Sequence, residues 1–114
     1  MAPILQTEAE YRKGSMGFGW AFNQIATLYA DRIVVNKSDG TVVATIMLGD
    51  IAGIKRTYYG ALKFTMKDGS KGRLDFIVMK YRFFGLIGML LSGARAKGAQ
   101  WEDAILKVSA VKKA

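Results

Sequence analysis

The stretch LKFTMKDGSKGRLDFIV, residues 62–78, decides the fold class because two strand-like runs flank a turn. Residues 62–66 and 73–78 alternate apolar and polar side chains, the pattern of a strand with one buried face. Residues 67–72 supply the glycines and the aspartate that tight hairpin loops require. A β-hairpin is therefore predicted. Its inward side chains are Leu62, Phe64, Met66, Leu74, Phe76 and Val78.

The opposite face of this hairpin is predicted to be exposed to solvent and mostly positively charged. Side chains between the apolar positions point away from the core, because strand side chains alternate with a period of two. They are Lys63, Lys67, Arg73 and Asp75.

Further strand-like runs precede the hairpin. Residues 32–35 and 41–48 are rich in β-branched side chains and flank the turn KSDG at 37–40. The remaining strands are expected at residues 51–57 and, more weakly, within 4–11, 17–22 and 24–29. About seven short strands at this spacing indicate a barrel or a sandwich.

The C-terminal part is predicted to be helical, after a β core at about residues 4–79. Apolar side chains recur at helical spacing over residues 99–112 and form one stripe. They are Trp101, Ala104, Ile105, Val108 and Val111. A second, glycine-containing helix is expected at residues 83–96, after a strand break or bulge near Met79. The fold class is thus mainly β with a C-terminal helix.

Length and composition limit the classes of protein. The 114 residues, 51% of them hydrophobic, suit a single domain spanning residues 1–114. Cysteine and histidine are absent, which excludes thiolate nucleophiles, zinc sites built on sulfur or imidazole, and the serine–histidine–aspartate triad. An enzyme is not expected, and no cofactor or metal is implied.

The net charge of +8 is concentrated in the second half of the chain. Residues 1–54 carry four basic and five acidic side chains, whereas residues 55–114 carry 13 basic and four acidic ones. This asymmetry favours a polyanionic partner, and the alternative is that scattered lysines keep a small protein dissolved.

Basic residues gather where the hairpin meets the preceding strand. The candidate anion or lipid head-group site comprises Lys55, Arg56, Lys63 and Arg73. An arginine can bind a phosphate through two N–H groups, and a lysine adds a point charge. The alternative is a solvated edge hairpin whose charges discourage pairing with another sheet.

The stretch KYRFFGLIGMLLSGARAKG, residues 80–98, combines apolar and small residues with basic flanks. An apolar helix of this kind can lie in a membrane interface or pack against a second copy, and the alternative is that it covers the open edge of the barrel. The candidate contact residues are Phe83, Phe84, Gly85, Gly88, Ser92 and Arg95. Its uncharged run is shorter than the roughly 20 residues that a spanning helix needs.

The order of four short motifs resembles the pleckstrin-homology (PH)-like superfold, most closely its GRAM and bacterial PH-like branch. The motifs are ATLYADRIVV at 26–35, IMLGDI at 46–51, LKFTMKDG at 62–69 and WEDAI at 101–105. Relatives often have threonine at the position of Ala30 and serine at that of Gly49. They also have a shorter link between the last strand and the tryptophan.

The resemblance implies a partly open barrel of two crossed sheets, plugged at one end by the C-terminal helix, in a non-enzymatic adaptor. The expected partners are another protein or an anionic membrane surface, with self-association into a homo-oligomer. The alternative is single-stranded nucleic acid, because aromatic residues are interleaved with basic ones. The N-terminus lacks signal-peptide features, so we expect a cytoplasmic protein, with peripheral attachment to the inner face of the membrane as a further expectation.

Overall fold

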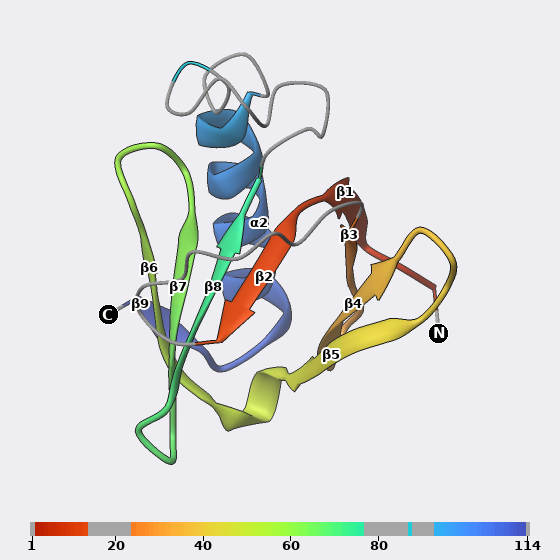
Figure 1. The fold of residues 1–114 in the computed structure, drawn as a ribbon. Coiled ribbons are helices and arrows are strands. Elements are labelled where there is room, and N and C mark those ends of the chain that lie inside the picture. The colour runs from red at the N-terminus through yellow and green to blue at the C-terminus, as the bar shows by residue number, and fades with distance from the viewer. Residues whose placement is uncertain (1, 14–23, 77–86, 88–92, 114) are drawn as a thin grey trace.

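The computed structural model describes residues 2–13, 24–76, 87 and 93–113. In these residues the chain forms two β-sheets and one C-terminal helix (Figure 1). The coarse prediction of a mainly β domain with a C-terminal helix is therefore confirmed. The predicted strand at residues 17–22 and the bulge near Met79 lie outside the described residues.

The first sheet has four antiparallel strands in the order β1-β3-β4-β5. Their bounds are Leu5–Glu8 (β1), Gln24–Leu28 (β3), Arg32–Lys37 (β4) and Val42–Met47 (β5). The predicted hairpin between β4 and β5 is confirmed: Gly40 adopts a φ of 91°, and the Asp39 carboxylate accepts a hydrogen bond from the Thr41 amide at 2.9 Å.

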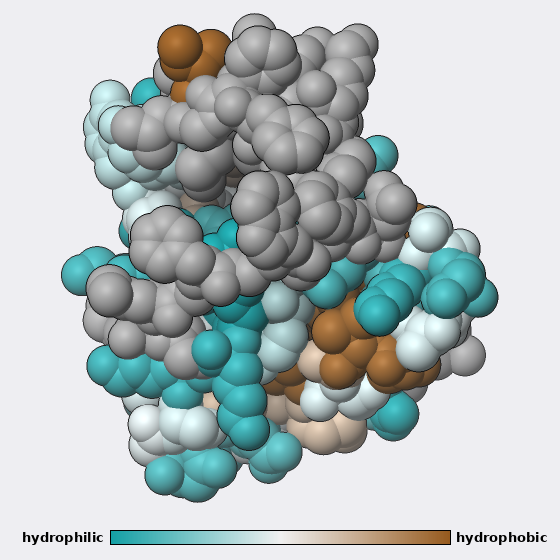
Figure 2. All heavy atoms as spheres, viewed as in Figure 1, coloured by the Kyte–Doolittle hydropathy of each residue, from teal (hydrophilic) through white to brown (hydrophobic). Residues whose placement is uncertain are grey.

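Strand β5 forms one edge of this sheet and carries exposed apolar side chains. Val42 is 56% exposed and Val43 38%. Figure 2 shows this hydrophobic surface, in brown, over the region of β4 and β5. The strand contains no charged residue that would oppose pairing with another strand.

The second sheet has five strands in the order β2-β8-β7-β6-β9. Their bounds are Glu10–Lys13 (β2), Lys71–Asp75 (β8), Leu62–Met66 (β7), Ile51–Arg56 (β6) and Lys112–Lys113 (β9). The predicted hairpin of residues 62–78 is present as β7 and β8, with a tighter turn than expected: Met66 donates to the Ser70 carbonyl and Gly69 donates to the Met66 carbonyl.

Two short connections carry the chain from one sheet to the other. Only Ala9, 1% exposed, separates β1 from β2, although these strands belong to different sheets. The 3-10 turn η1 (Leu48–Asp50) connects β5 to β6. The described strands thus form two sheets joined at corners and do not close into a barrel.

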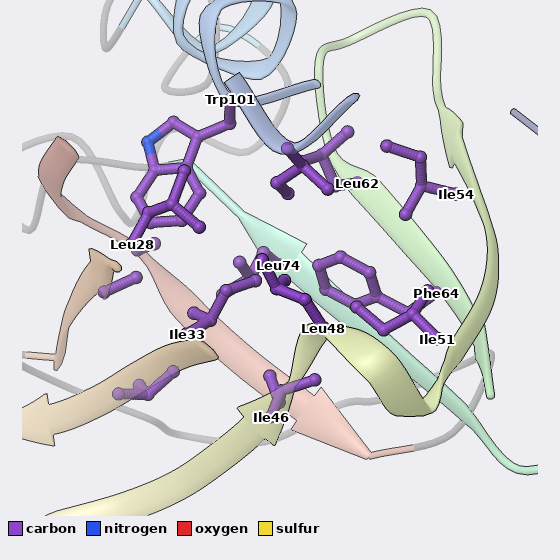
Figure 3. Close-up of a cluster of buried hydrophobic side chains, with 14 of the residues drawn as sticks. Leu28, Ile33, Ile46, Leu48, Ile51, Ile54, Leu62, Phe64, Leu74 and Trp101 are labelled. Atoms are coloured by element: carbon purple, nitrogen blue, oxygen red, sulfur yellow. The ribbon is translucent and has the colours of Figure 1, made fainter. Parts of the chain in front are cut away.

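The core lies between the sheets and the helix, and Figure 3 shows its side chains converging from all three. The predicted inward side chains Leu62, Phe64, Leu74 and Phe76 are at most 1% exposed, and Met66 is partly buried against the cluster. Val78 lies outside the described residues. Alternation along the hairpin therefore predicted the buried face correctly.

Helix α2 (Ala94–Val108) covers the core and differs in its bounds from the predicted helix at 99–112. It starts after Gly93, which adopts a left-handed conformation, so residues 94–96 belong to α2 and not to a separate helix. The rest of the second helix expected at 83–96 lies outside the described residues, apart from Ile87.

The end of α2 corrects two predicted members of its apolar stripe. Ser109 ends the helix: its backbone is extended, and its hydroxyl donates to the Ile105 carbonyl and accepts from the Val111 amide. Val111 therefore lies after the end of the helix, where it is buried, and Val108 is 37% exposed. Trp101 and Ile105 are fully buried, as predicted.

Candidate functional site

Four basic residues form a line across the second sheet. Strand register places Arg12 opposite Arg73, Arg73 opposite Lys63, and Lys63 opposite Lys55. Directly paired residues share a sheet face, so one cation from each of β2, β8, β7 and β6 stands on the side away from Leu62, Phe64 and Leu74. We call these four residues the basic row.

The two arginines of the basic row are partly neutralised by carboxylates in the neighbouring row. Arg73 contacts Asp75 at 2.9 Å, and Arg12 contacts Glu10 at 3.1 Å. Glu10 and Asp75 are themselves register partners, so the two ion pairs lie side by side on β2 and β8. The arginine side chains remain 21% and 27% exposed.

The two lysines of the basic row are exposed and face each other across β6 and β7. Like charges directly opposite each other destabilise a sheet. Within residues 2–13, 24–76 and 93–113, no carboxylate forms an ion pair with Lys55 or Lys63. The pair therefore offers two uncompensated positive charges on one sheet face.

Arg56, expected beside these residues, lies elsewhere. It pairs with Leu62 at the end of β6 and lines a pocket of about 530 Å³ together with α2. We call this the turn pocket. Its described lining residues are Arg56, Thr57, Tyr58, Gly60, Arg95 and Ala96. The predicted group of four is thus divided: Lys55, Lys63 and Arg73 share one face, and Arg56 joins Arg95.

The turn pocket exists because the β6–β7 turn touches the helix directly. A Cβ atom at Gly98 would overlap the Gly60 carbonyl, and one at Gly60 would overlap the Ala94 carbonyl. Gly60 also has a φ of 95°, which favours glycine. The Arg95 guanidinium lies 4.8 Å from the centre of the Tyr58 ring, and Tyr58 meets Tyr59 edge to face.

The sequence groups Arg95 with the apolar contact residues of 80–98 and does not predict that it lines a pocket with Arg56. The other candidates of that stretch, Phe83, Phe84, Gly85, Gly88 and Ser92, lie outside the described residues. Arg95 is exposed on the first turn of α2, and Ile87 is 63% exposed. Arg12 was missed because only strand pairing brings residue 12 beside residue 73.

Several carboxylates take part in ion pairs or in hydrogen bonds within turns. Asp31 binds the Arg32 guanidinium, whose hydrogen bonds lower the pKa of that carboxyl. In the two hairpin turns, hydrogen bonds from Thr41 and Ser70 lower the pKa of Asp39 and Asp68. Glu102, largely buried, contacts Lys113 at 3.6 Å. The described residues contain no cluster of three or more potential metal ligands.

None of the helices in the described part of the chain has both the length and the apolar character needed to cross a bilayer. No protein-family model and no curated protein matches the chain.

Proposed function

We propose that this protein is a non-enzymatic binding module of the PH and GRAM-like type that docks on an anionic membrane surface through the basic row. The observation that carries the proposal is the facing pair Lys55 and Lys63, exposed and without a carboxylate partner in the described residues. A sheet that keeps two like charges opposite each other loses stability, and an anionic surface would offset that loss.

The fold type of the proposal is supported by three features. A first strand bends at Ala9 and contributes to both sheets, two sheets enclose one core, and α2 covers that core. Trp101, near the middle of α2, lies 5.5 Å from Phe76 between ring centres and donates to the Thr7 hydroxyl at 3.2 Å. These features are compatible with a partly open barrel plugged by a helix.

Electrostatic magnitudes show that one copy would bind weakly. Each basic residue near an anionic surface contributes about 1 kcal/mol, so four supply at most about 4 kcal/mol, and less here because two of them are paired with carboxylates; this limit corresponds to a dissociation constant of about 1 mM. Linking several copies raises the effective affinity without new contacts. Self-association through residues 80–98 is therefore part of the proposal, and light scattering at high protein concentration tests it. A strictly monomeric protein would contradict that part.

Vesicle sedimentation tests the membrane contact. The double variant Lys55→Gln/Lys63→Gln is compared with Lys37→Gln/Lys107→Gln, which removes the same charge from exposed lysines of other elements. We expect the first variant to bind vesicles of phosphatidylserine and phosphatidylcholine roughly thirtyfold more weakly, since two contributions of about 1 kcal/mol are lost. The control should bind almost as the parent protein does.

Two results would overturn the membrane contact. One is equal binding to these vesicles and to pure phosphatidylcholine vesicles. The other is tight, salt-sensitive binding of a single-stranded oligonucleotide that the Lys55→Gln/Lys63→Gln variant loses while vesicle binding is unchanged. That second result would indicate that the basic row binds single-stranded nucleic acid instead of a membrane.

A further inference from the structure

We infer that the turn pocket binds a phosphomonoester group, with Arg56 and Arg95 as its cationic ligands. The inference goes beyond the proposed function, because it concerns a different site and a small ligand and does not require a membrane. Two arginines, one from β6 and one from α2, line this pocket.

The charge around the pocket favours an anion. Its described lining includes two basic side chains, Arg56 and Arg95, and no acidic one. In the described part of the chain, neither Arg56 nor Arg95 forms an ion pair. Two arginines without a carboxylate partner in a shared cavity are complementary to a phosphate dianion.

The hydrogen-bonding edge of Arg95 stays available in this arrangement. Its guanidinium is held 4.8 Å from the centre of the Tyr58 ring, a cation–π contact that attracts the flat face of the group. The N–H donors lie in the plane of the guanidinium, so an anion can still bind them at the edge. Tyr58 is 71% exposed, so its ring stands at the rim of the pocket.

The pocket is built from rigid parts. Thr57 and Ala61 form two hydrogen bonds. The Thr57 amide donates to the Ala61 carbonyl at 2.8 Å, and the Ala61 amide donates to the Thr57 hydroxyl at 3.1 Å. The Gly60 backbone then lies directly against Gly98 of α2. The turn and the helix therefore fix the backbone positions from which Arg56 and Arg95 reach the pocket, which reduces the ordering cost of binding.

The pocket has room for a ligand larger than inorganic phosphate. A cavity of about 530 Å³ is in the range of small-molecule sites, so a phosphate with a polyol- or sugar-sized substituent suits it. Such a group exists both as a soluble phosphate ester and as a lipid head group with a terminal phosphate.

The test is a titration of the full chain with glycerol 3-phosphate at constant ionic strength, followed by amide NMR. We expect saturable shifts of Gly60 and Ala96. Arg56→Gln and Arg95→Gln should each weaken binding at least tenfold. The control Lys107→Gln removes one positive charge from the far end of the same helix and should leave binding unchanged. Thermal melting verifies that each variant is folded.

The outcomes separate this inference from the proposed function. Shifts that chloride reproduces at equal ionic strength, or that persist in the Arg56→Gln/Arg95→Gln double variant, would overturn phosphate binding in the turn pocket and leave the proposal for the basic row unaffected.

A comparison of vesicles containing phosphatidic acid with vesicles containing phosphatidylglycerol identifies the source of the phosphate. A preference for phosphatidic acid that needs both arginines supports a lipid head group, and equal vesicle binding beside saturable glycerol 3-phosphate binding supports a soluble ester.

Discussion

At Gly98 and Gly60 the absence of a Cβ atom allows the β6–β7 turn and α2 to pack in direct contact. Both residues are buried, and their backbones touch where the β6–β7 turn meets α2. The sequence contains 13 glycines, and composition does not distinguish these two from the others. Gly49 has open space around the position of a Cβ atom, whereas Gly98 faces the Gly60 carbonyl. The requirement for glycine at residue 98 is therefore visible only after α2 is docked.

Gly98→Ala is predicted to destabilise the fold although alanine is the better helix former. The helical preference for alanine gains about 1 kcal/mol, but the overlap is with backbone, which no rotamer change relieves. We expect a net loss of about 1–3 kcal/mol in the free energy of unfolding, measured with urea. Gly49→Ala is the matched control and should change little. A Gly98→Ala protein as stable as the parent would contradict the close approach.

The turn aspartates predict how stability depends on pH. Hydrogen bonds from Ser70 and Thr41 lower the pKa of Asp68 and Asp39 in the folded protein, so their contribution is present above the unfolded pKa of about 3.9 and is lost as pH falls through the folded value. The variant Asp39→Asn/Asp68→Asn should therefore lose less stability between about pH 6 and about pH 2 than the parent does.

Urea unfolding at several pH values measures this difference. Asp103→Asn, on the exposed side of α2, serves as the control and should follow the parent curve. An acid limb that is equally steep in the parent and the turn variant would show that these aspartates do not contribute to it.

Helix α2 illustrates what periodicity does and does not predict about an element. The spacing of Trp101 and Ile105 identified the buried face, because both contact the core. Its limits were missed for local reasons: Gly93 starts the helix from a left-handed conformation, and the Ser109 hydroxyl ends it. Periodicity contains no information about either cap, so Val111 was assigned to a helix that stops before it.

Trp101→Ala is predicted to detach α2 from the core. Trp101 is fully buried, packs against Phe76 and donates a hydrogen bond to Thr7, so its removal leaves a large cavity and loses a link to β1. We expect a loss of about 3–5 kcal/mol in the free energy of unfolding. Lys107→Ala, exposed on the same helix, should change it by less than about 0.5 kcal/mol. A small effect of Trp101→Ala would mean that α2 contributes little to the core.

The candidate sites were predictable only as far as a single hairpin extends. Alternation placed Lys63 and Arg73 on one outer face, and strand pairing confirms that they are opposite each other. Arg12 joins the same row because β2 pairs with β8, and Arg95 lines the turn pocket with Arg56 because α2 docks there. Neither placement has a local sequence signal, because both depend on how distant elements meet.

At the scale of the whole molecule, part of the net charge of +8 is gathered at two sites. The basic row and the turn pocket use basic residues from β2, β6, β7, β8 and α2. If exposed charges drive vesicle binding, salt must weaken it, since the screening length falls from about 10 Å at 0.1 M to about 3 Å at 1 M salt. We expect sedimentation with phosphatidylserine vesicles to be almost abolished over that range. Binding that persists at about 1 M salt would indicate apolar insertion instead.

The bend at Ala9 also has a consequence for the order of events in folding. Strand β1 pairs with β3, whereas β2 pairs with β8. Tyr11 of β2 therefore meets its partner Leu74 only after most of the chain has been synthesised. Contacts between residues so far apart in sequence slow the search for the native topology. We therefore expect the N-terminal strand to close the second sheet late. Deletion of residues 2–13 would remove that closing step and leave β8 as an open edge, prone to pairing with other chains.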